Sequence, residues 1–214
     1  MPNPRTTWIP VVLFVLITWQ VVDHGPLLRA DRWVSAGLLH PDRFSEVLSD
    51  LGNVQVAVPV LLVAAGCAAW RGRRDGAVRW WRVPLAAPAT MAVLPVLLVP
   101  LKEWTARPGT SVMPPGTGYF PSGHTSTAVL AYGGAVIVLL PWLGTAPARR
   151  LAAAGGVVLV LAVSYGLVRR GYHWPLDVVA AWCLGLVLLT PLAVLSRSTR
   201  RSSSGTASPR SGPS

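Results

Sequence analysis

The feature that most constrains this sequence is a series of six long apolar runs separated by short polar connections. Each is close to the ~17–25 residues that a helix needs to cross the ~30 Å hydrocarbon core of a bilayer. Any single run could be a buried core helix, but six of them leave too little polar chain to coat a soluble globule. The runs are Trp8–Val22, Val54–Trp70, Val83–Leu101, Thr125–Leu143, Leu151–Val168 and Pro175–Leu195.

Composition agrees with a membrane protein. Of 214 residues, 52% are hydrophobic and 13% are charged, about half the charged fraction of a soluble domain. A cleaved signal peptide is a minor alternative for the first run, although no small-residue cleavage site follows it. We predict an all-α integral membrane bundle of six transmembrane helices in one domain over residues 1–195. The segment 196–214 is rich in Ser, Arg, Gly and Pro, which predicts a disordered cytoplasmic tail.

Taken alone, the net charge of +11 would suggest a nucleic-acid partner. The positions of the basic residues relative to the spans give another explanation. With six spans and both termini on one side, that side carries twelve basic residues and the opposite side seven. This asymmetry follows the positive-inside rule and places both termini in the cytoplasm. Membrane orientation therefore explains the basicity, and we expect no nucleic-acid partner.

The connections on the outer side differ in character. In the first, Asp23–Asn53, apolar residues recur at near-helical spacing, which predicts a helix on the membrane surface. The second, Thr105–Phe120, is rich in Gly and Pro and should have little regular structure. Cys67 and Cys183 both fall inside spans, so no disulfide framework and no metal site is expected.

Polar and ionisable residues gather at the outer ends of the third to sixth spans. Ionisable groups at membrane depth are costly and mark a functional site by default. Their occurrence at three junctions on one side predicts a single cluster. The residues are Lys102 and Arg107 after the third span, Ser122, Gly123 and His124 before the fourth, and Arg169, Arg170, His173 and Asp177 between the fifth and sixth.

These residue types suit a phosphate monoester. Lys and Arg supply donors and positive charge for phosphate oxygens. Ser122 and Gly123 would begin a helix, whose free N–H groups and positive dipole end receive an anion. His173 and Asp177 are four residues apart, so the carboxylate can hold one imidazole nitrogen and leave the other nucleophilic. His124 would then be the acid that protonates the departing alkoxide.

Each residue also has an ordinary structural interpretation. Asp177 and Ser122 are good helix caps, and Lys102, Arg169 and Arg170 could be interfacial anchors. Their joint occurrence at one depth favours the catalytic interpretation.

The pattern resembles the type-2 phosphatidic-acid phosphatase superfamily, whose members share a site with vanadium haloperoxidases. That family has three motifs, K-x6-R-P, P-S-G-H and S-R-x5-H-x3-D. Pro121–His124 matches the second motif in full, and His173 with Asp177 matches the core of the third. The resemblance extends over nearly the whole chain, from the first span to the sixth.

The resemblance implies a role for each matching residue. His173 is the nucleophile that forms a phosphohistidine, and His124 is the general acid and later the base that activates water. Asp177 orients His173, while Lys102, Ser122 and Gly123 hold the phosphoryl oxygens. No metal and no cofactor is implied.

The sequence departs from the family pattern at two arginines. Gly109 and Thr110 stand where the first motif has Arg-Pro, and Arg107 comes two residues earlier, so we expect Arg107 to reach the phosphate through the loop. Leu167 stands where the third motif has Arg. Arg170 lies one helical turn further on the same face, so we expect it to be the replacement, with Arg169 second.

The expected protein is therefore a bacterial lipid phosphatase of the cell membrane, with its site facing the outside or periplasm. Its partners are a lipid phosphate and the surrounding membrane lipids. Phosphatidic acid, phosphatidylglycerophosphate and a polyprenyl pyrophosphate all fit, and no feature indicates an oligomeric state. One alternative is a lipid phosphotransferase. The other is a non-catalytic anionic-lipid-binding protein or transporter, and the missing arginines favour this second alternative only.

Overall fold

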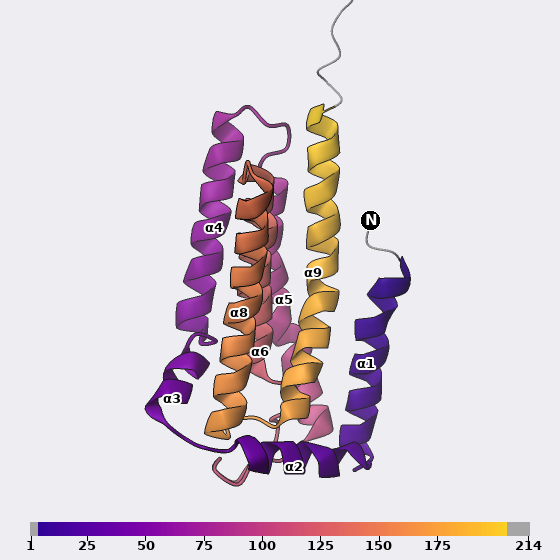
Figure 1. The fold of residues 1–214 in the computed structure, drawn as a ribbon. Coiled ribbons are helices and arrows are strands. Elements are labelled where there is room, and N and C mark those ends of the chain that lie inside the picture. Colours follow the sequence, from indigo (N-terminus) through magenta and orange to yellow (C-terminus); the bar gives the residue numbers. More distant parts are fainter. Residues whose placement is uncertain (1–3, 205–214) are drawn as a thin grey trace, which may run out of the picture.

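The structure, a computed structural model, describes residues 4–204 and is all-helical over that range. Five long helices form a bundle with the composite fourth span at its centre (Figure 1). They are α1 (Pro4–Val22), α4 (Val54–Arg74), α5 (Arg82–Thr105), α8 (Ala146–Arg170) and α9 (Pro175–Ser204). Two shorter helices, α2 (Leu27–Leu38) and α3 (Arg43–Asp50), lie across one end of the bundle.

Five segments are long and apolar enough to cross a membrane, and α1 together with α2 makes a sixth, bent by 91°. The all-helical class and the membrane-helix character are thus confirmed, with five to six candidate spans. The helices are longer than the apolar runs because they continue into polar flanks. α4, for example, extends from the expected end at Trp70 to Arg74.

The fourth span is a composite helix. It consists of α6 (Gly123–Ala128), a π-helical turn η1 (Val129–Gly133), α7 (Gly134–Leu139) and a 3₁₀ turn η2 (Leu140–Trp142). It is the most buried of the candidate spans. Within the π-helical turn, the Tyr132 hydroxyl donates a hydrogen bond to the carbonyl of Leu51 at 2.6 Å, which ties this span to the connection between α3 and α4.

The bundle is apolar inside and outside. Leu61, Leu130 and Val163 are among the fully buried core residues, whereas Val63 of α4 and Leu151 of α8 are 66% and 75% exposed. Large apolar side chains around the outer wall would be unfavourable in water and suit hydrocarbon. This distribution is that of a multi-pass membrane protein.

The end of the bundle that carries the functional residues is held by α2 and α3. α3 begins with a capping box in which the Asp42 carboxylate accepts from the Ser45 N–H. Arg169 at the end of α8 also donates to Asp42, at 2.9 and 3.1 Å. The Ser45 hydrogen bonds and the guanidinium lower the pKa of Asp42 from 3.8 to about 2. α3 is thereby fixed against α8.

The connection between the first two apolar runs contains two helices rather than the one expected, because the chain turns between Leu38 and Arg43. The second, from Ala106 to Ser122, has no helix or strand, as its Gly and Pro content predicts. α9 continues past the expected start of the tail at Ser196 to Ser204, and residues 205–214 lie outside the described residues. From the end that carries α2 and α3, α1 and α9 both extend toward the opposite end of the bundle, and α9 reaches further than α1 (Figure 1).

Candidate active site

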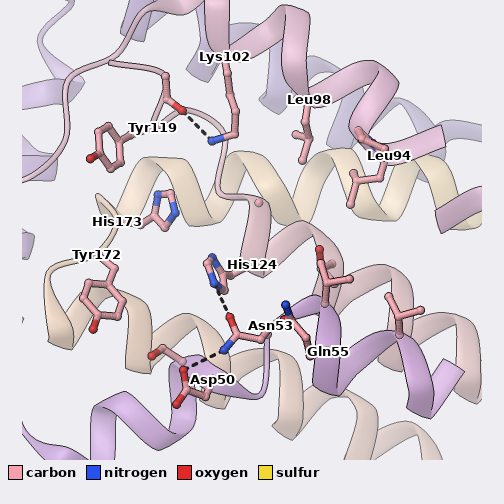
Figure 2. A pocket seen from close by; sticks show the side chains of 18 of the residues that line it. Asp50, Asn53, Gln55, Leu94, Leu98, Lys102, Tyr119, His124, Tyr172 and His173 are labelled. Atoms are coloured by element: carbon pink, nitrogen blue, oxygen red, sulfur yellow. Dashed lines mark hydrogen bonds between the residues drawn. The ribbon is translucent and has the colours of Figure 1, made fainter. Parts of the chain in front are cut away.

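A cavity of about 840 Å³ opens where α3, α4, α5 and α6 meet the turn before α9. Lys102 from the last turn of α5, Gly123 and His124 from the start of α6, and His173 from the turn between α8 and α9 all line it. Figure 2 shows His124 and His173 on facing sides of this space, with Lys102 above them. Three junctions distant in sequence therefore contribute to one pocket.

His173 is oriented by Asp177, one helical turn further along the chain. Nδ1 of His173 lies 3.2 Å from Oδ2 of Asp177. The same oxygen accepts from the N–H of Trp174 at 3.1 Å, and the carboxylate is completely buried. A carboxylate can only accept, so Nδ1 carries a proton, and in the neutral imidazole the lone pair is then on Nε2 of His173.

Arg107 lies behind this pair. Its guanidinium donates to Oδ1 of Asp177 through one nitrogen and to Oδ2 of Asp31 through another. Asp31, on α2, also accepts from the N–H of Leu176 at 2.8 Å. The arginine side chain is 7% exposed and both carboxylates are 0% exposed. Arg107 thus joins α2 to the carboxylate that holds His173, and it does not line the cavity.

The start of α6 faces the cavity with a free helix terminus. Ser122 is its N-cap, and the hydroxyl accepts from the N–H of Thr125 at 3.2 Å. The N–H of Ser122 donates a hydrogen bond to the carbonyl of Asp177 at 3.1 Å, which sets the distance between α6 and α9. Gly123 leaves the adjacent space open, since a Cβ there would meet nothing within 4 Å. An anion can therefore approach this helix terminus closely.

Lys102 reaches the same region from α5. Its Nζ donates to the carbonyl of Gly118 at 2.7 Å, so the ammonium is held by the loop before α6. An ammonium has three donors, and the remaining ones are available to a ligand.

His124 has a hydrogen-bond partner in the connection between α3 and α4. Its Nε2 lies 2.7 Å from Oδ1 of Asn53, and Nδ2 of Asn53 donates to Oδ1 of Asp50 at 3.0 Å (Figure 2). Asp50 is the last residue of α3, Asn53 lies in the connection from α3 to α4, and both line the cavity.

Comparison with known proteins agrees with this geometry. Residues 85–201, more than half of the chain, match the model of the PAP2 superfamily. The chain belongs to the PAP2 superfamily. This confirms the resemblance seen in the motifs, and the matched residues include Lys102, His124 and His173.

Two similar proteins show how far the likeness extends. The undecaprenyl-diphosphatase of Sulfolobus acidocaldarius is 42% identical over 73 residues, which cover 34% of this chain and 31% of that protein. The match thus spans about a third of the relative's length. The crystal structure of a transmembrane PAP2 type phosphatidylglycerolphosphate phosphatase from Bacillus subtilis superposes with a TM-score of 0.70 at 22% identity, covering 91% of this chain and 97% of that one. At that identity the likeness concerns the fold.

The structure accounts for the two arginines of the PAP2 pattern that this chain lacks. At Gly109 a Cβ would lie 2.8 Å from the ring of Tyr119, so a long side chain there would have to displace that ring. Leu167 is 0% exposed and belongs to the apolar core. The next residue of the loop, Thr110, donates to the carbonyl of Gly171 and ties the loop to the turn that carries His173.

The basic residues considered as replacements have other partners. Arg169 pairs with Asp42, and Arg170 contacts Glu46 at 3.5 Å and the Tyr172 hydroxyl at 3.2 Å. Neither arginine lines the cavity. Among the described residues, Lys102 is the cation that does.

Sequence reasoning overlooked Asp31, Asp50 and Asn53. None belongs to a PAP2 motif. Asn53 directly precedes the second apolar run, so applying the search for polar residues at outer span ends to that run would have found it. Asp31 gives no comparable signal, because it is one of several acidic residues in the first connection.

Proposed function

We propose that this protein is a membrane lipid phosphatase that hydrolyses a phosphomonoester or pyrophosphate of a lipid through a phosphohistidine. The observation that carries the proposal is the pairing of His173 Nδ1 with the buried Asp177, which leaves Nε2 free beside Lys102 and His124. The PAP2 membership supports phosphate ester hydrolysis as the reaction class.

The first step forms the covalent intermediate. Nε2 of His173 attacks phosphorus while the bond to the leaving oxygen breaks, and His124 gives that oxygen a proton. Lys102 and the N–H groups at the start of α6, beside Ser122 and Gly123, stabilise the charge on the phosphoryl oxygens. Asp177 stabilises the positive charge that develops on the His173 ring.

The second step releases phosphate. His124, now neutral, takes a proton from water as the water oxygen bonds to phosphorus and the bond to His173 breaks. The cycle returns both imidazoles to their starting states and needs no metal, because the charge is met by Lys102 and the helix terminus. Arg107 supports this chemistry from behind Asp177, and direct phosphate contact by Arg107, Arg169 or Arg170 stays a prediction.

The shape of the cavity supports a lipid substrate. Leu98 and Leu94 line it one and two turns from Lys102 along α5. At 1.5 Å per residue, this apolar wall extends about 12 Å from the ammonium toward the middle of the span. A phosphate at the rim with a hydrocarbon chain along α4 and α5 fits such a gradient. Phosphatidic acid, phosphatidylglycerophosphate and a polyprenyl pyrophosphate are the candidates.

The membrane orientation follows from charge. In the proposed topology, twelve of the nineteen basic residues belong to the side that carries the N- and C-terminal segments, which supports a cytoplasmic location for that side and a site outside or in the periplasm of the cell membrane. Gly116 and Gly144 are exposed at opposite ends, and a Cβ at either one meets no atom closer than 4.0 Å. With Cys67 and Cys183 replaced by Ala, an impermeant maleimide should label Gly116→Cys in intact cells and spare Gly144→Cys. The reverse result would overturn the orientation.

The catalytic assignment is tested with purified protein in detergent and a panel of the three lipid classes. Wild type should release inorganic phosphate from at least one of them, equally with and without chelator, and vanadate should inhibit because it mimics the trigonal-bipyramidal phosphoryl species. His173→Ala should lose at least about a thousandfold in kcat. Full activity of His173→Ala would exclude it as the nucleophile, and transfer of phosphate to an alcohol without free phosphate would indicate a phosphotransferase.

A further inference from the structure

Asn53 occupies the N-cap position of α4 but does not cap the helix. Asn is among the residues most favoured at this position because its side chain can accept from the first free N–H groups. Here the side chain makes no such bond. It points away from α4, toward His124 and Asp50 (Figure 2). A side chain diverted from its usual local partner indicates a role elsewhere.

The direction of these hydrogen bonds is determined by Asp50. A carboxylate can only accept, so the Asn53 amide must present its NH₂ group to Asp50. The amide oxygen then faces His124, and it too can only accept. The proton at this contact must therefore sit on Nε2 of His124. Asp50 and Asn53 together select one tautomer of the ring, and Nδ1 is left for the cavity.

The connection that carries Asn53 is packed against His124 by independent contacts. A Cβ at Gly52 would lie 3.1 Å from the carbonyl of His124 and 3.2 Å from its Cβ, so glycine permits this close approach. The neighbouring carbonyl of Leu51 accepts from the Tyr132 hydroxyl. The backbone is thus held in place without help from the Asn53 side chain, so replacing that side chain tests its own contribution.

We infer that Asn53, oriented by Asp50, is a positioning residue that keeps the proton on Nε2 of His124 and makes Nδ1 the nitrogen that exchanges protons with the substrate. The inference rests on the proposed function, in which His124 is the acid and base. Nδ1–H of the imidazolium gives its proton to the leaving oxygen as the P–O bond breaks and His173 bonds to phosphorus. The neutral ring, still protonated at Nε2, then accepts a proton from water at Nδ1 when the phosphohistidine is hydrolysed.

Leaving-group dependence tests this role. Octyl phosphate expels an alkoxide that needs a proton, whereas p-nitrophenyl phosphate expels a stable anion that does not. Asn53→Leu, close to Asn in size but without an acceptor, should lower kcat/KM for octyl phosphate about 10–100-fold and that for p-nitrophenyl phosphate less than about threefold. For p-nitrophenyl phosphate kcat alone should fall, because hydrolysis of the phosphohistidine still needs His124 as the base.

Three further variants separate positioning from general damage. Asn53→Asp keeps an acceptor oxygen for Nε2 and should recover most of the octyl phosphate activity. Asp50→Ala frees the Asn53 amide to turn and should cause a smaller loss with the same preference for the alkyl ester. Gln55 lines the same cavity but has no hydrogen bond to His124. In the control variant Gln55→Leu, the ratio of kcat/KM for the two esters should therefore stay as in wild type.

The outcomes are distinguishable. A wild-type protein that cleaves neither ester nor any lipid of the panel contradicts the proposed function itself. An active wild type with Asn53→Leu equally impaired on both esters, or impaired on neither, overturns the inference about Asn53 and leaves the phosphatase proposal standing. Thermal unfolding of each variant in detergent identifies any that loses kcat/KM through misfolding. Loss of folded protein lowers kcat/KM for both esters equally, so the ratio of the two kcat/KM values still tests the role of Asn53 in such a variant.

Discussion

The guanidinium of Arg107 binds one oxygen of the Asp177 carboxylate, and Nδ1 of His173 contacts the other. Since Arg107 also binds Asp31, one arginine pairs with two buried carboxylates, one of which contacts His173. Removing a partner from such a group leaves unpaired charge in a low-dielectric setting. The arginine therefore affects both the stability of this end of the bundle and the orientation of His173.

Arg107→Met should destabilise the protein by about 3–5 kcal/mol and lower kcat at least about tenfold. Asp31 and Asp177 would repel one another without the guanidinium, and His173 would lose its fixed orientation. Thermal unfolding in detergent and steady-state kinetics measure the two effects. Arg169→Met is the matched control, because Arg169 also binds a carboxylate but is partly exposed. Equal stability losses for the two variants would contradict the role given to Arg107.

Lys102→Gln should reduce kcat/KM at least about tenfold more than Arg170→Gln. Lys102 lines the cavity, whereas Arg170 contacts Glu46 and Tyr172 outside it. A phosphate-binding cation stabilises the transition state, and a surface pair contributes little. Phosphate release from the preferred lipid at several concentrations gives both values. A larger loss at Arg170 would show that its side chain turns to the phosphate when substrate binds.

Acid should remove the contribution of Asp42 to stability. The pKa of Asp42 is lowered from 3.8 to about 2 in the folded protein, so its ionised form stabilises the fold above about pH 4. That contribution is lost as the pH falls from 3.8 through 2, because the folded protein must then take up the proton. Asp42→Asn keeps the capping oxygen and removes the charge. Its melting temperature should be below that of wild type at pH 6 and approach it near pH 2, and a constant difference would contradict the assignment.

Filling the apolar part of the cavity should affect lipids and spare small esters. Val58 of α4 lines the cavity, so Val58→Trp should raise KM for a long-chain lipid phosphate several-fold and leave kcat/KM for p-nitrophenyl phosphate within about threefold. Val63→Trp is the control on the same helix, since Val63 is 66% exposed on the outer wall. If Val58→Trp and Val63→Trp behave alike with the lipid, the chain does not lie along this wall.

Most of the fold could be predicted from the sequence, because membrane-spanning helices are signalled locally. Apolar runs such as Val54–Trp70 and Pro175–Leu195 carry their own length and hydropathy, and the helices α4 and α9 begin where those runs begin. The motif residues could be placed for a similar reason. Pro121–His124 is contiguous, and His173 and Asp177 are one helical turn apart.

The sequence by itself thus determined the class of the protein, the approximate spans and the segments that meet at the cavity. Only the tertiary structure decided which side chains pair there. Arg107 lies beside Asp31 and Asp177, Arg170 beside Glu46, and Asn53 beside His124, although these partners are far apart along the chain. A charged or polar group removed from water must bind whichever complementary group lies nearest in space, and that neighbour is known only when the helices have packed.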